Sequence, residues 1–263
     1  MPGGFVNLLR SPALAHVVRR GSDWVDLQWS VLEASLKAVA PRARGRLLDV
    51  GCGDKPYEAW FRPYVRSYFG IEHASAFAAT SAGGRRGPDV VYAGGRMPFR
   101  DGAFDTVLSV QVLEHTPQPQ ALVDEMARVL APDGLLILTA PFQFRLHEQP
   151  YDFFRYSPHG LRTLCAAAGL EVIETVAQGS LWSVLGQKLN SFLAFRLARI
   201  GNLAQMMGKL GHEAPQKLGP RWWTLPFAGP AMVSIAATAR LMDRLAPDDE
   251  ETLGFLVVAR HRR

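Results

Sequence analysis

The sequence predicts an α/β fold built on a doubly wound, largely parallel sheet. Short apolar segments typical of buried strands alternate with segments of helical periodicity through the first two thirds of the chain. The connections are short and carry turn residues such as Pro98, Asp101-Gly102 and Asp133-Gly134. This alternation places successive strands in parallel with helices on both faces. A chain of 263 residues with 48% hydrophobic residues can bury the core of one large domain and still carry an insertion.

The expected elements begin with a helix that lies over the sheet. Apolar residues between Trp24 and Val39 recur at helical spacing, and Pro41 ends that pattern. We expect strands at residues 46–50, 67–71, 89–92, 106–110, 135–139, 170–176 and 253–259, and helices at 57–64, 118–130 and 157–168.

The first strand runs into a Gly-X-Gly turn, Gly51-Cys52-Gly53, which is typical of a site for a nucleotide-type ligand. A dinucleotide fingerprint needs a third glycine three positions later, where Pro56 stands. Asp49 at the strand end and Asp54 in the turn would repel a diphosphate. Carboxylates suit a ligand that carries an ammonium and a sulfonium group, which favours S-adenosylmethionine.

Ligands of open α/β sheets lie beyond the carboxyl ends of the strands. Glu72 follows the second strand, about 20 residues after the glycine turn, where an acid can accept both ribose hydroxyl protons. Gln111 follows the fourth strand, and a further loop follows Pro141. We therefore expect these positions and the glycine turn to line one crevice.

Three residues near that crevice are candidates for handling a proton: His115, His147 and Asp152. His147 is the first choice for a general base, with Arg155 and Tyr156 close behind in the chain. An alternative is that His147, Asp152, Arg155 and Tyr156 only tie down a long loop by hydrogen bonds. His115 could cap a helix or line the adenine pocket, and it is a second candidate base.

Other chemistries find less support. Cys52 is expected to be inert, because the sequence places no histidine near it that could activate the thiol as a nucleophile. The histidines are scattered without metal-ligand spacing, so no metal is expected. Two cysteines and an N-terminus without the features of a signal peptide predict a cytoplasmic protein.

Five segments together resemble the successive motifs of the type 11 family of class I S-adenosylmethionine-dependent methyltransferases. They are Leu48-Asp49-Val50-Gly51-Cys52-Gly53, Met97-Pro98-Phe99, Phe104-Asp105, Val112-Leu113-Glu114-His115 and Arg128-Val129-Leu130-Ala131-Pro132-Asp133-Gly134. Each motif alone is weak, but their order and spacing over residues 47–173 are specific. The resemblance implies a Rossmann-like, seven-stranded sheet whose last strand is antiparallel, with a helical insertion before that strand.

The resemblance also implies which residues bind the cofactor S-adenosylmethionine. They are Asp49, Gly51, Cys52, Gly53, Tyr57, Glu72, Met97, Phe99, Gln111 and His115. Many members carry an acid where Ala93 stands, at a position associated with the adenine amine. Adenine is therefore expected to be held by backbone groups and by Met97 and Phe99. Residues 53–57 and 147–156 further resemble a subgroup associated with bacterial cell-surface polysaccharide and glycolipid pathways.

The expected reaction is methyl transfer to a small-molecule, sugar-linked or lipid-linked acceptor, most simply O-methylation with a histidine base. Transfer to nitrogen or carbon is an alternative. A second alternative is a non-catalytic subunit that binds S-adenosylmethionine, which the residue Ala93 favours. A nicotinamide oxidoreductase is disfavoured by Asp49 and Pro56.

We expect four regions: an N-terminal helical cap at 1–45, a methyltransferase core at 46–180, a helical insertion at 181–246, and the final strand with a basic tail at 247–263. Residues 181–242 carry a net charge of +6, whereas the rest of the chain carries −1. The basic residues of this segment are Lys188, Arg196, Arg199, Lys209, Lys217, Arg221 and Arg240, against the single acid Glu213.

Aliphatic residues at helical spacing and three tryptophans, Trp182, Trp222 and Trp223, accompany that charge. This composition is typical of a helix lying in a bilayer surface, which would make the protein peripheral on the inner face of a membrane. A lid or a dimerisation arm is the alternative. The uncharged run 222–239 is expected to be interrupted by Pro226, Gly229 and Pro230, which argues against a membrane span. Nucleic-acid binding is not expected, because aliphatic residues separate the basic ones.

Overall fold

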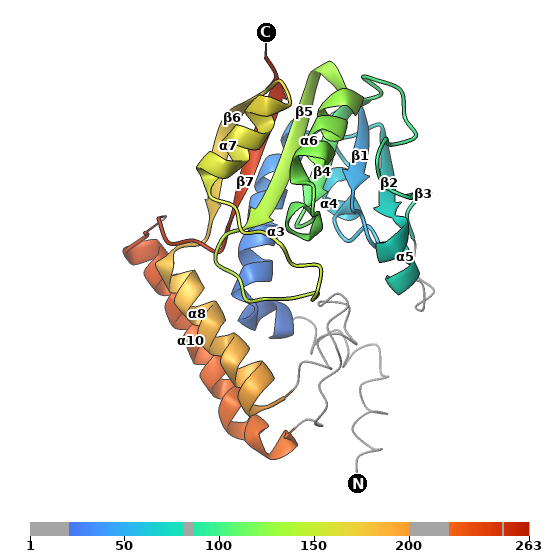
Figure 1. The fold of residues 1–263 in the computed structure, drawn as a ribbon. Coiled ribbons are helices and arrows are strands. Elements are labelled where there is room, and N and C mark those ends of the chain that lie inside the picture. Colours follow the sequence, from blue (N-terminus) through green and yellow to red (C-terminus); the bar gives the residue numbers. More distant parts are fainter. Residues whose placement is uncertain (1–20, 81–86, 200–220, 249, 263) are drawn as a thin grey trace. The chain divides into compact units, whose positions relative to one another are not determined.

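The computed structural model describes residues 21–80, 87–199, 221–248 and 250–262. It contains a seven-stranded sheet in the order β3-β2-β1-β4-β5-β7-β6 (Figure 1). The strands are β1 (Arg46–Val50), β2 (Ser67–His73), β3 (Val90–Tyr92), β4 (Phe104–Val110), β5 (Leu130–Pro141), β6 (Leu170–Gln178) and β7 (Gly254–His261). Strands β1 to β5 pair in parallel, and β7 is antiparallel to both of its neighbours. The expected doubly wound sheet with an antiparallel last strand is confirmed.

Helices α3 (Leu27–Val39), α6 (Pro119–Val129) and α7 (Pro158–Ala167) follow the predicted periodicity. Further short helices accompany them, namely the 3-10 helix η1 (Ala40–Arg42), α4 (Glu58–Phe61), α5 (Ala74–Thr80) and the 3-10 helix η3 (Leu113–His115). Helix α6 buries Leu122, Met126 and Val129 against the sheet, as their spacing predicts. Helix α7 begins where Ser157 and Pro158 indicate, because the Ser157 hydroxyl accepts the backbone N–H of Gly160.

Three elements differ from the prediction. Strand β5 starts at Leu130, and the turn at Asp133-Gly134 is an irregularity inside it, because the register against β4 shifts at this point. Residues Ala74–Thr80 form α5, where the Gly/Ala/Ser-rich composition indicated no element. Helix α4 is shorter than expected, because Pro63 has no N–H with which to continue it.

The chain divides into two units: residues 33–178 with 252–263, and residues 1–32 with 179–251. We call them the core unit and the helical unit. This division groups residues 21–32 with the helical unit, whereas the sequence predicts a separate N-terminal cap at 1–45. Within the helical unit, the Asn190 side chain donates to the carbonyl of Val25, and the Gln187 side chain accepts the N–H of Leu27.

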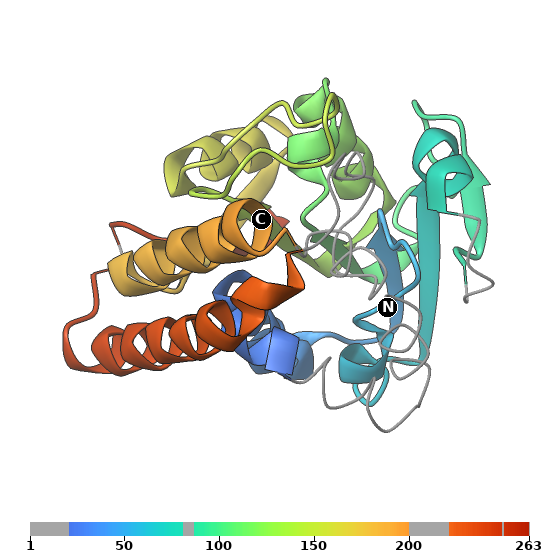
Figure 2. The ribbon, with the colours of Figure 1, turned by 90° about the horizontal axis from the view of Figure 1, so that it is seen from below.

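The helical unit contains two long helices that run side by side, α8 (Leu181–Ser191) and α10 (Leu225–Leu245) (Figure 2). Between them in sequence come a π-helical turn, η4 (Phe192–Leu197), and a 3-10 turn, η5 (Trp222–Thr224). Gly186 allows the close approach of the two helices, because a Cβ at that position would lie 2.9 Å from Cβ of Ala239.

The expectation that prolines interrupt residues 222–239 is wrong. Pro226 lies in the first turn of α10, where no helical N–H is needed, and the helix continues through Pro230. By length and composition α10 is able to cross a membrane. The basic and acidic positions Lys209, Lys217 and Glu213 lie outside the described residues, as does the side chain of Trp222.

Candidate functional site

The glycine turn after β1 passes close to the chain that follows β4. Gly51 has a φ of +73°, and a Cβ there would lie 2.4 Å from Cγ2 of Val112. The N–H groups of Gly51 and Cys52 both donate to the carbonyl of Ile71, which fixes the turn against β2. Gly53, with a φ of +48°, has open space where its Cβ would be. The turn is thus packed on one side and open on the other.

We expect Gly51→Ala to destabilise the core unit by about 1–3 kcal/mol more than Gly53→Ala, because only the former overpacks its surroundings. Both variants share the cost of a positive φ for an L residue, about 1–2 kcal/mol. Urea unfolding measures the difference, and equal destabilisation by the two variants would contradict the close packing of the turn.

Two buried acids flank this turn. The Asp49 carboxylate is 1% exposed and accepts the Tyr68 hydroxyl at 2.5 Å. Burial raises the pKa of Asp49 to about 7, against the opposing effect of the Tyr68 hydrogen bond. Burial also raises the pKa of Glu72, whose Oε2 accepts the N–H of Gly53 at 2.8 Å. The nearby Lys55 ammonium is 2.6 Å from Asp89. A pair of buried acids beside a glycine turn fits a cationic adenosyl ligand such as S-adenosylmethionine and disfavours a diphosphate.

The other predicted cofactor residues occupy different environments. Gln111 has a φ of +55°, which is rare for a residue other than glycine, and its side chain donates to Oγ1 of Thr139. Met97 is 1% exposed and lies in the core, and Phe99 packs edge-on against Phe104. Contacts of Met97 and Phe99 with adenine stay a prediction. Cys52 is buried, and its burial raises the thiol pKa far above the ordinary value, as expected for an inert cysteine.

Tyr57 connects the glycine turn with the end of β4. Burial raises the pKa of its phenol, and the carboxylates of Asp49 and Glu114 both act in the same direction. Strands β1 and β4 pair in parallel, so the glycine turn after β1 and the residues after β4 lie at the same end of the sheet.

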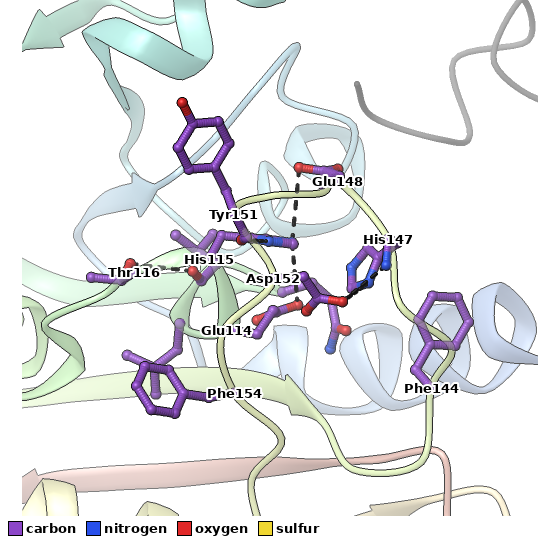
Figure 3. Close-up of polar contacts among 12 residues, drawn as sticks. Glu114, His115, Thr116, Phe144, His147, Glu148, Tyr151, Asp152 and Phe154 are labelled. Carbon is purple, nitrogen blue, oxygen red and sulfur yellow. Dashed lines mark hydrogen bonds and ion pairs between the residues drawn. The ribbon is translucent and has the colours of Figure 1, made fainter. Parts of the chain in front are cut away.

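His115 and His147 come together at that end, although 32 positions separate them in sequence (Figure 3). Their ring centroids are 4.8 Å apart. His115 Nδ1 lies 2.7 Å from the carbonyl oxygen of Tyr151, and since a carbonyl only accepts, this nitrogen carries the hydrogen. In the neutral ring, Nε2 of His115 is then the nitrogen that carries the lone pair. Burial lowers the pKa of His147 to about 4, and the neighbouring His115 acts in the same direction, so that His147 is a neutral imidazole at pH 7.

Glu114 is not among the site residues that the sequence predicts. It lies in η3 beside His115 and is fully buried. Neither of its carboxylate oxygens has a hydrogen-bond partner among the described residues, and Oε1 is 3.8 Å from Nε2 of His115. Burial raises the pKa of Glu114 to about 8. Its only signal in the sequence is its place in the segment 112–115, which gives no indication that it is buried.

The loop after β5 is held by an ion pair. Arg155 contacts the Asp152 carboxylate through two nitrogens, at 2.6 and 2.8 Å, and donates to the carbonyls of Phe144 and Arg145. Burial acts to raise the pKa of Asp152, but the Arg155 hydrogen bonds, the backbone N–H of His147 and the nearby positive charge together outweigh it and lower the pKa to about 2.

Asp152 also accepts the backbone N–H of His147 at 2.9 Å, and its Oδ2 lies 3.2 Å from Nδ1 of His147. Tyr156 is buried and donates to the carbonyl of Leu113. These contacts agree with the loop-staple alternative for Asp152, Arg155 and Tyr156. They leave His147 held in place beside His115.

Comparison with known proteins identifies related sequences. Residues 48–138 match a family model described as a methyltransferase domain. An uncharacterised methyltransferase of Mycobacterium leprae is 39% identical over 106 residues, which are 38% of this chain and 38% of that protein. An uncharacterised methyltransferase of Mycobacterium tuberculosis strain H37Rv is 39% identical over 99 residues, which are 35% of this chain and 38% of that protein. The chain thus spans under two fifths of the length of the relatives it matches.

Solved structures share the fold at low identity. A methyltransferase of Haloferax volcanii, in complex with the Trm112 methyltransferase activator, superposes with a TM-score of 0.52 at 18% identity and covers 93% of this chain and 94% of its own. The [4+2]-cyclase SpnF has a TM-score of 0.51 at 20% identity, with coverages of 86% and 80%. At these identities the likeness shows the fold alone, and a reaction has to be argued from the site.

Proposed function

We propose that this chain, which carries a methyltransferase domain over residues 48–138 on a class I sheet, is an enzyme that transfers the methyl group of S-adenosylmethionine to an acceptor. The observation that carries the proposal is the acid-lined glycine turn at the end of β1. Asp49 and Glu72 are both buried there, and the cation beside them, Lys55, is engaged by Asp89. A ligand with a positive charge would stabilise these buried carboxylates, so the site favours a cationic ligand.

The cofactor would supply a methyl group already activated on a sulfonium. The residues of this chain have the task of holding the donor and bringing the acceptor into line with it. The Glu72 carboxylate is placed to accept ribose hydroxyls, and Asp49 to attract the ammonium and sulfonium charge. The N–H of Gly53, which points to Glu72 at 2.8 Å, keeps that carboxylate beside the open face of the turn.

The acceptor that we propose is a hydroxyl group of a small, sugar-linked or lipid-linked molecule. A hydroxyl must lose its proton as it attacks, and the cluster of Glu114, His115 and His147 lies at the same end of the sheet as the glycine turn. The lone pair on Nε2 of a neutral His115 ring would accept that proton. His115 is favoured over His147, because burial lowers the pKa of His147 to about 4 and so makes it a weak base.

Calorimetric titration with S-adenosylmethionine and S-adenosylhomocysteine tests the cofactor site, and a turnover assay with labelled methyl donor and candidate acceptors tests the reaction. Binding with turnover is the expected result. Binding without turnover over a wide range of acceptors would favour the non-catalytic subunit. An absence of binding would overturn the proposal.

We also propose that the helical unit attaches the protein to an anionic membrane surface. Large apolar side chains are exposed on its helices and turns, namely Leu185, Leu189, Phe192, Leu197, Trp223, Phe227, Val233, Leu241 and Leu245. Arg240, one of the basic residues expected to contact the membrane, is engaged inside the helical unit. It donates to Ser30 and lies over the ring of Trp24. The apolar residues therefore support this proposal more than the net charge does.

We expect the protein to sediment with anionic liposomes, and a double variant Trp223→Ser/Phe227→Ser to sediment less. These two side chains are 71% and 77% exposed, so their loss should not disturb folding. Val91→Ser, on an exposed position of the core unit, is the matched control. Equal sedimentation of all three proteins, or none at low salt, would refute membrane attachment.

A further inference from the structure

We propose that Glu114, His115 and His147 bind a divalent transition-metal ion. One carboxylate oxygen and one ring nitrogen from each histidine lie within 4.8 Å of one another (Figure 3). Two ligands of one ion, each about 2.1 Å from it, are about 3–4 Å apart. The separation of 3.8 Å between Glu114 Oε1 and His115 Nε2 already falls in this range. The ring nitrogen of His147 would have to move toward the other two donors by about 1 Å or less.

The buried Glu114 carboxylate is the observation that points to a ligand. Both of its oxygens are inaccessible and without a hydrogen-bond partner among the described residues. Burying a carboxyl group without a hydrogen bond costs several kcal/mol of folding free energy, so native structures rarely keep one without a partner. Its backbone is nevertheless fixed, because Phe153 donates to the carbonyl of Glu114 and Tyr156 donates to that of Leu113. The fold therefore holds this side chain in place for a partner that the protein itself does not supply.

The two histidines are oriented as metal ligands usually are. His115 is held through Nδ1 by the carbonyl of Tyr151, which leaves Nε2 toward Glu114. His147 has the buried Asp152 carboxylate 3.2 Å from its Nδ1, and Asp152 is itself fixed by Arg155. A carbonyl or carboxylate beside the second ring nitrogen is the recurrent arrangement around metal-bound histidines, and here it is a hydrogen bond for His115 and an ion-pair distance for His147.

The donor set selects the class of ion. Two imidazoles and a carboxylate suit Zn²⁺, Co²⁺, Fe²⁺ or Mn²⁺ better than Ca²⁺ or Mg²⁺, which prefer all-oxygen sites. Glu148 is 33% exposed and its Oε2 is 3.8 Å from Nε2 of His115, so it can approach as a fourth ligand. Three protein ligands leave at least one open coordination position, which is typical of catalytic metal sites.

The role of the ion rests on the proposed function, although its binding does not. An acceptor hydroxyl in the open position would have its pKa lowered by the ion, and its proton would leave to solvent. The oxygen then forms the new O–C bond as the S–C bond of the donor breaks. With an ion bound, the imidazoles hold it and no longer serve as the base.

Titration of the chelator-treated, full-length protein with Co²⁺ and with Zn²⁺, in the absence of S-adenosylmethionine, tests the site. We expect one ion per chain, with visible Co²⁺ absorption that reports nitrogen and oxygen ligands. Glu114→Gln and His147→Ala should each weaken binding at least about tenfold. His159→Ala, which removes an exposed histidine of α7, should bind as the wild type does.

Circular dichroism and thermal unfolding report whether each variant folds, and His147→Ala provides the test should Glu114→Gln fail to fold. Failure to bind one ion, or equal affinity in the two ligand variants and the control, would overturn the inference. Binding of S-adenosylmethionine is measured separately. Cofactor binding without metal binding refutes only this inference, and metal binding without cofactor binding refutes only the proposed function.

Discussion

Replacing His115 by alanine is expected to lower the rate of methyl transfer by about 100- to 10,000-fold, the contribution usual for a positioned group that activates an acceptor. His115 Nε2 is the lone pair directed at the cluster, and Tyr151 holds the ring in place from the other side. His147→Ala should produce a loss of similar size, because His147 is the second imidazole ligand of the proposed metal ion. The affinity for S-adenosylmethionine should change little, because the acids that attract it, Asp49 and Glu72, are untouched.

His159→Ala is again the matched control, because it removes an imidazole from an exposed position on α7 without touching the cluster. Single-turnover rates with saturating cofactor separate the chemical step from binding. Full turnover in both His115→Ala and His147→Ala would show that acceptor activation takes place elsewhere, even if the methyltransferase assignment is right.

Asp49→Asn is expected to stabilise the cofactor-free protein at pH 8 and to weaken its cofactor binding. In the folded chain the pKa of Asp49 is about 7, whereas its ordinary value is 3.8. Between these two values the folded state holds a proton that the unfolded state has lost, so stability falls as pH rises through this window and levels off above it. At 1.36 kcal/mol for each pKa unit, the loss above pH 7 is on the order of 4 kcal/mol.

Asparagine has a similar shape, can still accept the Tyr68 hydroxyl and carries no charge to bury. The difference in unfolding free energy between wild type and Asp49→Asn should therefore grow from near zero below pH 4 to its full size above pH 7. Chemical denaturation at a series of pH values measures this difference. A difference that does not depend on pH would contradict the burial of an ionised Asp49.

The same substitution tests the cofactor site. The wild-type affinity for S-adenosylmethionine should decrease below pH 7, by up to about tenfold for each pH unit, because the cation binds the ionised carboxylate. Asp49→Asn should bind more weakly and lose this dependence. Asp54→Asn, in the same turn but exposed, should retain it. A wild-type affinity that is flat between pH 5 and pH 8 would exclude Asp49 as the cation-binding group.

The fold was predictable from the sequence because its signals are local. Apolar strands, the glycine turn and the proline at the start of α7 each act within a few residues. The antiparallel last strand came from the family resemblance. The exact extent of β5 was not accessible, because it depends on its register with β4 around Phe104. Pro230 was misinterpreted as a helix breaker, since a helix packed against α8 tolerates one lost hydrogen bond.

The site was only partly predictable. Asp49 and Glu72 follow from their places at the strand ends, and both lie there. The cluster of Glu114 with two histidines did not follow, because its members come from two loops and no spacing in the sequence connects them. Burial decides their chemistry, and the burial of Glu114 arises only in the folded protein, where Phe153 of the loop after β5 donates to its carbonyl.

The position of β7 has a consequence for how the protein is made. This strand lies between β5 and β6, yet residues 254–261 leave the ribosome after every other strand of the sheet. Until they emerge, β5 and β6 have no partner between them, and the nascent chain exposes two unpaired strand edges. The sheet therefore cannot close until the helical unit that precedes β7 in the chain has been synthesised, and a chain arrested before that point exposes edges that favour aggregation.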